Sequence, residues 1–256
     1  MTSLKPMKTS LYLADLNKVG MKDIEQVGGK NASLGEMLQN LTQLGIQIPG
    51  GFIITVAAYR EFIKFNNLDE DIHSIIGQIN FEEIESLRRG GLQARQLLKN
   101  AKFPKELSEA IIEKYYELSK VYNQEMTDVA VRSSATAEDL PDASFAGQQE
   151  TYLNVRGPAQ LMNSVRNCFA SIFTDRAISY RQGFGYDHFS IGLSVCVQKM
   201  VRSDLGTSGV AFSLDTENGF KDVVIINGSY GLGEMIVQGS VSPDEYLVFK
   251  PTLKKG

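Results

Sequence analysis

One stretch near the middle of the chain constrains the fold most. Two strand-like segments, 129–131 and 151–153, are separated by a long run of small, hydroxylated and acidic residues, a pattern that predicts strand, long loop, strand. A loop of this length inside a compact domain is usually functional or disordered. The composition is too apolar for disorder, because the run contains Leu140 and Phe145. We therefore expect an ordered loop that holds a ligand.

The residue types in this stretch suit a polyphosphate. The loop and its first strand offer one cation and several hydroxyls, at Arg132, Ser133, Ser134 and Thr136. Gly147 lets a ligand approach the backbone closely. The alternative is a surface loop whose serines cap turns and whose arginine pairs with Glu138 or Asp139. Composition alone leaves both interpretations open.

A second glycine-rich turn precedes a predicted helix. Gly28-Gly29-Lys30 comes directly before an apolar stripe with helical spacing at Leu34, Met37, Leu38, Leu41 and Leu44. Ser33 and Glu36 have the spacing of a capping box, and Gly45 is expected to end the helix.

Lys30 is expected at the start of that helix, where the dipole favours anions. The turn is not a Walker P-loop, because Ile24 stands where that motif needs glycine and Asn31 where it needs serine or threonine. The alternative for Lys30 is a solvated lysine without a ligand.

The composition is that of an ordinary globular protein of one large or two small domains, with 256 residues, 43% hydrophobic and 22% charged. A net charge of −4 and pI ≈ 5.4 argue against nucleic acid and anionic membranes as partners. No apolar run is long enough to span a bilayer and no secretory signal is evident, so we expect a cytoplasmic protein. Cys168 and Cys196 are expected to be buried reduced thiols, and a zinc site is not expected.

Hydrophobic periodicity predicts an α/β (α+β) fold in two parts. Helices are expected over 55–65, most of 69–124, and 160–181, and strands over 52–56, 191–201, 210–214, 223–226 and 246–249. We place a boundary near residue 190, between a helix-rich part, 1–190, and a sheet-rich part, 191–256. His73 and His188 are not expected to take part in chemistry.

Several of these segments together resemble one family. The matching residues are 27–36, 49–52, 131–141, 145–149, 200–204 and 231–234. They are similar to the N-terminal ATP-grasp region shared by phosphoenolpyruvate synthase, pyruvate phosphate dikinase and rifampicin phosphotransferase. The run 28–37 and the segments 242–246 and 250–253 resemble the synthase branch most. The resemblance covers nearly the whole chain and implies an ATP-grasp fold with an incomplete second lobe.

The resemblance also implies a site. In this family ATP lies between two lobes; by position, Lys30 and Arg132 would contact its phosphates, and Gly147 and Thr151 would line the nucleotide cleft. Gln198 would lie on the adenine-side strand, and the backbone of 195–200 would offer donors and acceptors to the base.

The implied reaction converts ATP, pyruvate and water to AMP, phosphate and phosphoenolpyruvate, through a phosphohistidine on a separate domain. Neither His73 nor His188 matches the carrier motif, so no catalytic residue is expected here and pyruvate would bind elsewhere. The ligands for Mg²⁺ are expected after residue 256, which makes the chain a fragment that is inactive alone, from an enzyme that is expected to form a homodimer. The remaining alternatives are the dikinase, a rifampicin-type phosphotransferase, or a nucleotide-binding module without catalysis.

Overall fold

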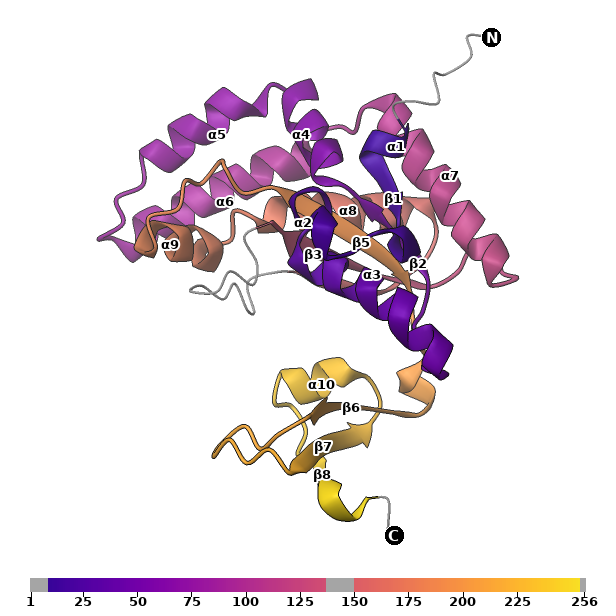
Figure 1. The fold of residues 1–256 in the computed structure, drawn as a ribbon. Coiled ribbons are helices and arrows are strands. Elements are labelled where there is room, and N and C mark those ends of the chain that lie inside the picture. Colours follow the sequence, from indigo (N-terminus) through magenta and orange to yellow (C-terminus); the bar gives the residue numbers. More distant parts are fainter. Residues whose placement is uncertain (1–8, 137–149, 254–256) are drawn as a thin grey trace. The chain divides into compact units, whose positions relative to one another are not determined.

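A computed structural model describes residues 9–136 and 150–253 (Figure 1). The chain divides into two compact units, Met1–Met200 and Val201–Gly256. The division falls after the boundary expected near residue 190, because the strand β5 (Leu193–Lys199) pairs with strands of the first unit. Each unit is described by itself below.

The first unit combines helices with one antiparallel sheet, which confirms the α+β prediction. Its helices are α1 (Thr9–Tyr12), α2 (Ile24–Val27), α3 (Gly29–Leu41), α4 (Val56–Phe65), α5 (Leu68–Gly77), α6 (Ile84–Asn100), α7 (Lys105–Val121), α8 (Pro158–Ser171) and α9 (Asp175–Gly183). Its strands are β1 (Leu13–Asp15), β2 (Gly51–Ile54), β3 (Val129–Ala135), β4 (Thr151–Val155) and β5. The strands form a sheet in the order β1-β2-β5-β3-β4, and all neighbours are antiparallel.

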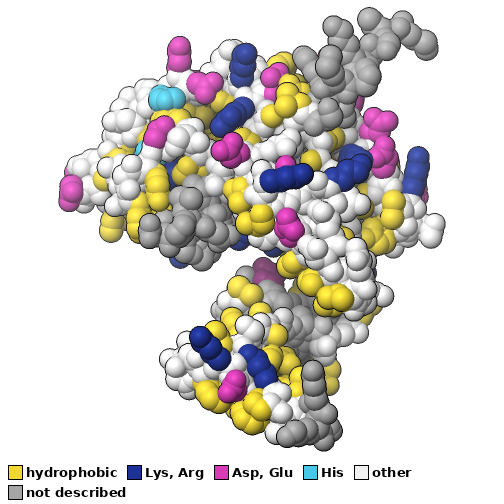
Figure 2. Space-filling model, in the orientation of Figure 1, with side chains coloured by type: hydrophobic (Ala, Val, Ile, Leu, Met, Phe, Trp, Pro, Cys, Tyr) yellow, Lys and Arg dark blue, Asp and Glu magenta, His cyan; other side chains and the backbone are white. Residues whose placement is uncertain are grey.

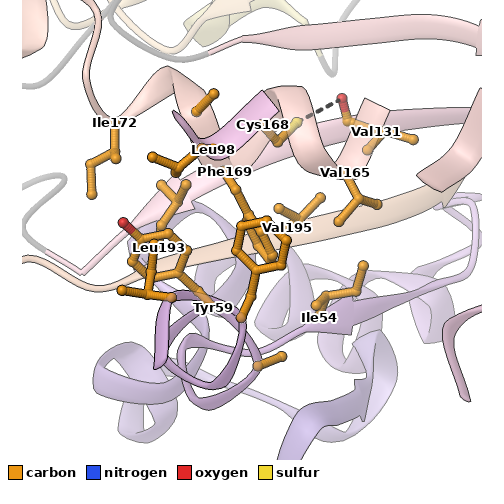
Figure 3. Close-up of a cluster of buried hydrophobic side chains, with 14 of the residues drawn as sticks. Ile54, Tyr59, Leu98, Val131, Val165, Cys168, Phe169, Ile172, Leu193 and Val195 are labelled. Carbon is orange, nitrogen blue, oxygen red and sulfur yellow. Dashed lines mark hydrogen bonds between the residues drawn. The ribbon is translucent and has the colours of Figure 1, made fainter. Parts of the chain in front are cut away.

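The main hydrophobic core lies on the sheet face that α4, α6 and α8 cover. Figure 3 shows its centre, where Phe169 of α8 packs between Tyr59 of α4 and the strand residues Ile54 and Val195. Every one of these side chains is buried. Burial of aromatic and branched side chains from distant parts of the chain is the main stabilising contribution to such a unit.

The opposite sheet face is covered by α3 and by the turns before it (Figure 1). A smaller core fills this side, formed by Leu16, Val19, Val27, Ala32, Ile53 and Cys196. The helix packs closely because Gly35 faces the Leu16–Lys18 turn, where an added Cβ would lie 2.2 Å from the carbonyl oxygen of Val19.

Two details of α3 differ from the sequence prediction. The helix begins at Gly29, so Ser33 lies inside it and the predicted capping box with Glu36 is wrong. The buried positions of the helix are small residues such as Ala32 and Gly35, whereas Leu44 is 74% exposed. The predicted apolar stripe is therefore only partly buried, because close packing on the turn selects small side chains.

The predicted helix 160–181 is two helices. It is interrupted after α8, and Thr174 caps the N-terminus of α9 by accepting a hydrogen bond from the Ala177 N–H over 3.3 Å. The remaining helix predictions of the first unit are confirmed by α4, α5, α6 and α7. Cys168 and Cys196 are free and buried, as predicted.

The second unit is a three-stranded antiparallel sheet, β6 (Thr207–Phe212), β7 (Val223–Tyr230) and β8 (Asp244–Phe249), with a short helix, α10 (Gly233–Val237). Asp215 lies near the start of the β6–β7 connection and forms a hydrogen-bonded turn there, accepting from the Glu217 N–H over 2.9 Å. In the part of the chain that is described, no helix has the length and apolar character needed to cross a membrane.

Candidate nucleotide-binding site

The sheet register places two of the predicted site residues side by side. Arg132 of β3 lies opposite Thr151 of β4 and opposite Cys196 of β5. Residues directly opposite each other in an antiparallel sheet share one face. Cys196 belongs to the small core beneath α3, so Arg132 and Thr151 lie on the α3 face.

Gln198 lies on the same face, two residues along β5 from Cys196, because strand residues alternate between faces. Its side chain is half-buried and its Nε2 donates to the carbonyl oxygen of Pro49 over 2.9 Å. That hydrogen bond connects β5 to the turn that precedes β2.

The backbone of β5 does not offer free groups to a base. The strand is central, and it pairs with β2 on one side and β3 on the other. At its end, the N–H groups of Lys199 and Met200 donate to the carbonyl oxygens of Gly50 and Asp128. Within β5 these donors and acceptors are used in the sheet; the expectation that the backbone of 195–200 binds adenine stays a prediction.

The glycine turn before α3 packs directly on β3. Gly28 has φ 77° and ψ 160°, a conformation open essentially to glycine alone. A Cβ at Gly28 would lie 2.4 Å from Oγ of Ser134 and 2.8 Å from its carbonyl oxygen. Ser134 is two residues from Arg132 on β3 and lies on the same face. The turn therefore fixes the N-terminus of α3 beside the strand that carries Arg132.

Lys30 is the second residue of α3 and is half-buried. The helix contacts β3, so Lys30 and Arg132 belong to two elements packed together on one sheet face. The N-terminal N–H groups of a helix and its dipole favour an anion at that end. Two cations beside a helix N-terminus form an arrangement suited to phosphate.

The hydroxyls that the sequence suggested as phosphate donors are structural instead. Ser133 and Ser134 are fully buried. Thr136 accepts a hydrogen bond from the Gly192 N–H over 3.0 Å, and its own N–H donates to the carbonyl oxygen of Gly192. This part of the prediction is wrong for the two serines, because β3 continues through them and buries Ser134 beneath α3 and Ser133 on the other face of the sheet.

The other predicted parts of the loop lie outside the described residues. These are Gly147, Glu138 and Asp139. The strands predicted on either side of the loop are confirmed by β3 and β4.

Sequence reasoning missed a polar bridge that holds α3 on the sheet. Nδ2 of Asn31 donates to Oγ of Ser194 over 3.0 Å, and that hydroxyl lies within hydrogen-bond distance of the carbonyl oxygens of Val27 and Ser134. Asn31 and Ser194 are both fully buried. The signal was a serine inside the apolar run of β5, because a polar residue buried in a strand needs a partner.

Removing this hydroxyl is expected to loosen α3. Ser194→Ala should lower the free energy of unfolding by about 1–3 kcal/mol, because the buried amide of Asn31 loses its partner. Urea denaturation followed by circular dichroism measures the change. Ser190→Ala is the matched control, since Ser190 is exposed; equal costs for the two variants would contradict the bridging role.

The thiol beside Arg132 in the sheet is not activated as a nucleophile. Burial raises the pKa of the Cys196 thiol to about 11, while the charge of Arg132 lowers it. The thiol is therefore protonated near neutral pH and is a poor nucleophile. Across the described ranges, 9–136 and 150–253, no three histidine, cysteine or acidic side chains are grouped so that they could hold a metal ion.

Known proteins match this chain over nearly its whole length. Residues 24–255 match the family described as pyruvate phosphate dikinase, AMP/ATP-binding domain. The chain is 58% identical to a phosphoenolpyruvate synthase of Aquifex aeolicus, over 97% of this chain and 29% of the relative. Proteins of the same name from Synechocystis and Escherichia coli are 54% and 51% identical, over 100% and 93% of this chain and 32% and 30% of the relatives.

Fold and site together define an α+β nucleotide-binding domain of the ATP-grasp type. Its ligand is ATP or AMP, as the description of the matched family says. The chain belongs to the pyruvate phosphate dikinase AMP/ATP-binding domain family. It spans about 30% of the length of the three relatives named above.

Proposed function

We propose that this chain binds and orients ATP for a phosphoenolpyruvate synthase. Lys30 and Arg132 contact the phosphates, and Thr151, Gln198 and Gly147 line the nucleotide site. The observation that carries this assignment is the sheet register, which brings Arg132 and Thr151 together on the face that α3 covers. Phosphates favour such paired cations, and an arginine binds them with two parallel hydrogen bonds.

The activity proposed for the whole protein is conversion of ATP, pyruvate and water to AMP, phosphate and phosphoenolpyruvate. The similar proteins carry the name of that activity. The transferred group passes through a phosphohistidine on another domain, and pyruvate binds outside this chain. The contribution of this chain is to hold the polyphosphate and offset its charge.

Magnesium is part of this proposal, with its ligands outside the described residues. Bound Mg²⁺ neutralises charge on the transferred phosphoryl group. The described residues do not fit a magnesium site, because no three acidic or histidine side chains are grouped among them. We therefore derive no step through the metal.

We also propose a cytoplasmic homodimer as the setting of the whole protein. Two buried free thiols suit a reducing compartment. Nucleic acid and membranes are not proposed as partners, because the net charge is −4. Acidic and basic side chains are interspersed on the face of the first unit that Figure 2 shows.

Calorimetric titration of MgATP into the 256-residue chain tests the proposed site. Arg132→Gln should weaken binding about tenfold or more, because a charge-assisted hydrogen bond to phosphate contributes about 1.5–3 kcal/mol. Arg88→Gln is the control, since Arg88 is an exposed arginine of α6 paired only with Glu85 among the described residues. Equal ATP affinity of wild type and Arg132→Gln would refute the role of Arg132, provided that circular dichroism shows both folded.

A further inference from the structure

A cavity of about 390 Å³ lies on the other side of the first unit's sheet from α3. It is bounded by α4, α5, the turn before α9 and the segment that leads into β5. Tyr59 and Phe173 in its lining belong to the main core on the α8 face. The cavity is therefore separated by the sheet from Arg132 and Lys30. Its volume is in the range of sites for small organic ligands.

Much of the lining is apolar and aromatic. The side chains are Tyr59, Ile63, Ile72, Phe173, Phe189 and Ile191. Phe189 is held in place by His73 of α5, with ring centroids 3.4 Å apart and planes inclined by 9°. This stack fixes the segment before β5 against α5, so the cavity has a formed wall.

The polar part of the lining is mainly cationic. Arg60 and Lys64 project from α4 at positions one helical turn apart, and Asp69 of α5 is the only acid among the described lining residues. Neither cation forms an ion pair with another residue in the described part of the chain. An anion in the cavity would therefore meet two available cations.

A third cation lies directly behind the wall. Arg181 of α9 is 1% exposed, and its guanidinium lies 5.8 Å from the ring centroid of Phe173. Its Nε donates to Nδ1 of His188 over 3.1 Å, and its Nη2 has no hydrogen-bond partner among the described residues. Burial lowers the pKa of Arg181 to about 10, so it remains charged near neutral pH.

His188 does not offset this charge. Because Nδ1 accepts from Arg181, the ring proton lies on Nε2, close to Oε1 of Gln182 at 3.4 Å. Burial and the charge of Arg181 lower the pKa of His188 to about 4. A buried cation such as Arg181, which has no acidic partner within 9–136 and 150–253, attracts anions strongly, since little solvent screens it.

We propose that this cavity binds a small organic anion, a carboxylate or phosphate monoester, with a flat or branched apolar body. The acidic group lies near Arg60 and Lys64, and the body packs against the rings of Tyr59, Phe173 and Phe189. The charge of Arg181 supports binding from behind the wall. This inference does not depend on the proposed ATP site, which lies on the α3 face.

Phenyl phosphate is a suitable probe, and the chain allows a clean reporter because it contains no tryptophan. In Phe189→Trp, phenyl phosphate should change the tryptophan fluorescence in a saturable way with a Kd of about 1 mM or lower. Benzyl alcohol has the apolar ring without the anionic group, and inorganic phosphate has the anionic group without the ring. Each should bind at least about tenfold more weakly than phenyl phosphate.

The unmodified protein provides a second readout. It contains two histidines, and the imidazole NMR signals of His188, in the cavity lining, should shift on addition of phenyl phosphate with the same Kd. Because this measurement needs no substitution, it tests binding of phenyl phosphate even where Phe189→Trp disturbs the cavity wall.

Charge removal tests the mode of binding. Arg60→Gln and Lys64→Gln should each weaken phenyl phosphate binding about tenfold. Arg181→Met should weaken it while keeping the thermal midpoint of the protein. Lys105→Gln is the control, because the Lys105 side chain is 86% exposed on α7, and Arg132→Gln should leave binding unchanged.

Four results would overturn the proposal. The first is no saturable response to phenyl phosphate in either readout, and the second is equal binding of benzyl alcohol. The third is wild-type affinity in both Arg60→Gln and Lys64→Gln. Loss of binding in Arg132→Gln would instead locate the probe at the proposed ATP site, and would also refute a separate anion site. Failure of the ATP titration leaves these outcomes unaffected.

Discussion

Replacing Phe169 by alanine is expected to lower the free energy of unfolding by about 3–5 kcal/mol. The ring belongs to α8 and is fully buried, and its centroid lies 5.2 Å from that of Tyr59, 5.3 Å from that of Phe62 and 6.0 Å from that of Phe103. Truncation would leave a cavity between α4 and the sheet, and would remove three aromatic contacts. Urea denaturation followed by far-UV circular dichroism measures the loss, since most helices lie in the first unit.

Phe65→Ala is the matched control for this prediction. Phe65 is on α4 like Tyr59 and Phe62, but its side chain is 54% exposed. Its truncation should cost about 0.5 kcal/mol or less. If the two phenylalanines cost the same, then Phe169 would not be the centre of the core that supports the sheet.

The individual elements were predictable because their signals are local. The apolar spacing of α4 and α7 and the short apolar runs in β3 and β8 are each visible in a few neighbouring residues. The order of the strands was not predictable in the same way. The central place of β5 depends on its pairing with β2 and β3, which are far away in the sequence. This pairing uses the backbone N–H and C=O groups of β5 in hydrogen bonds within the sheet.

The adjacency of Arg132 and Thr151 follows from the predicted strand-loop-strand pattern, because the two strands that flank one loop commonly pair. Gln198 was assigned only through the family resemblance, whereas Lys30 was also indicated by its place at the start of a predicted helix. Their shared face results from non-local packing of α3 and β5. The roles of all four residues toward ATP stay predictions.

The misinterpreted hydroxyls show where local reasoning ends. A serine pair beside an arginine has the same composition in a phosphate loop and in a buried strand. The deciding fact is that Gly28 packs on Ser134. No local pattern at Ser134 indicates this contact, because the two residues are far apart in the chain.

Replacing Gly28 by alanine is expected to destabilise the first unit by about 4 kcal/mol or more, and to weaken ATP binding. The backbone at φ 77° and ψ 160° strains any residue with a Cβ. The added methyl would also lie 2.8 Å from the carbonyl oxygen of Ser134. A backbone atom cannot rotate away, so α3 must shift from β3 and move Lys30 relative to Arg132. Urea denaturation and calorimetric titration of MgATP measure the two effects.

Gly157→Ala separates strain from contact. Gly157 also precedes a helix and has nearly the same backbone, φ 81° and ψ 160°, but its added Cβ would meet only the flexible thioether of Met126, at 3.2 Å. This variant should cost about 2 kcal/mol and leave ATP affinity unchanged. Equal destabilisation by both substitutions would mean that α3 moves away from Ser134 at little cost in free energy. A larger loss at Gly28, with weaker ATP binding while the protein is still folded, would link the packing of this turn to the phosphate site.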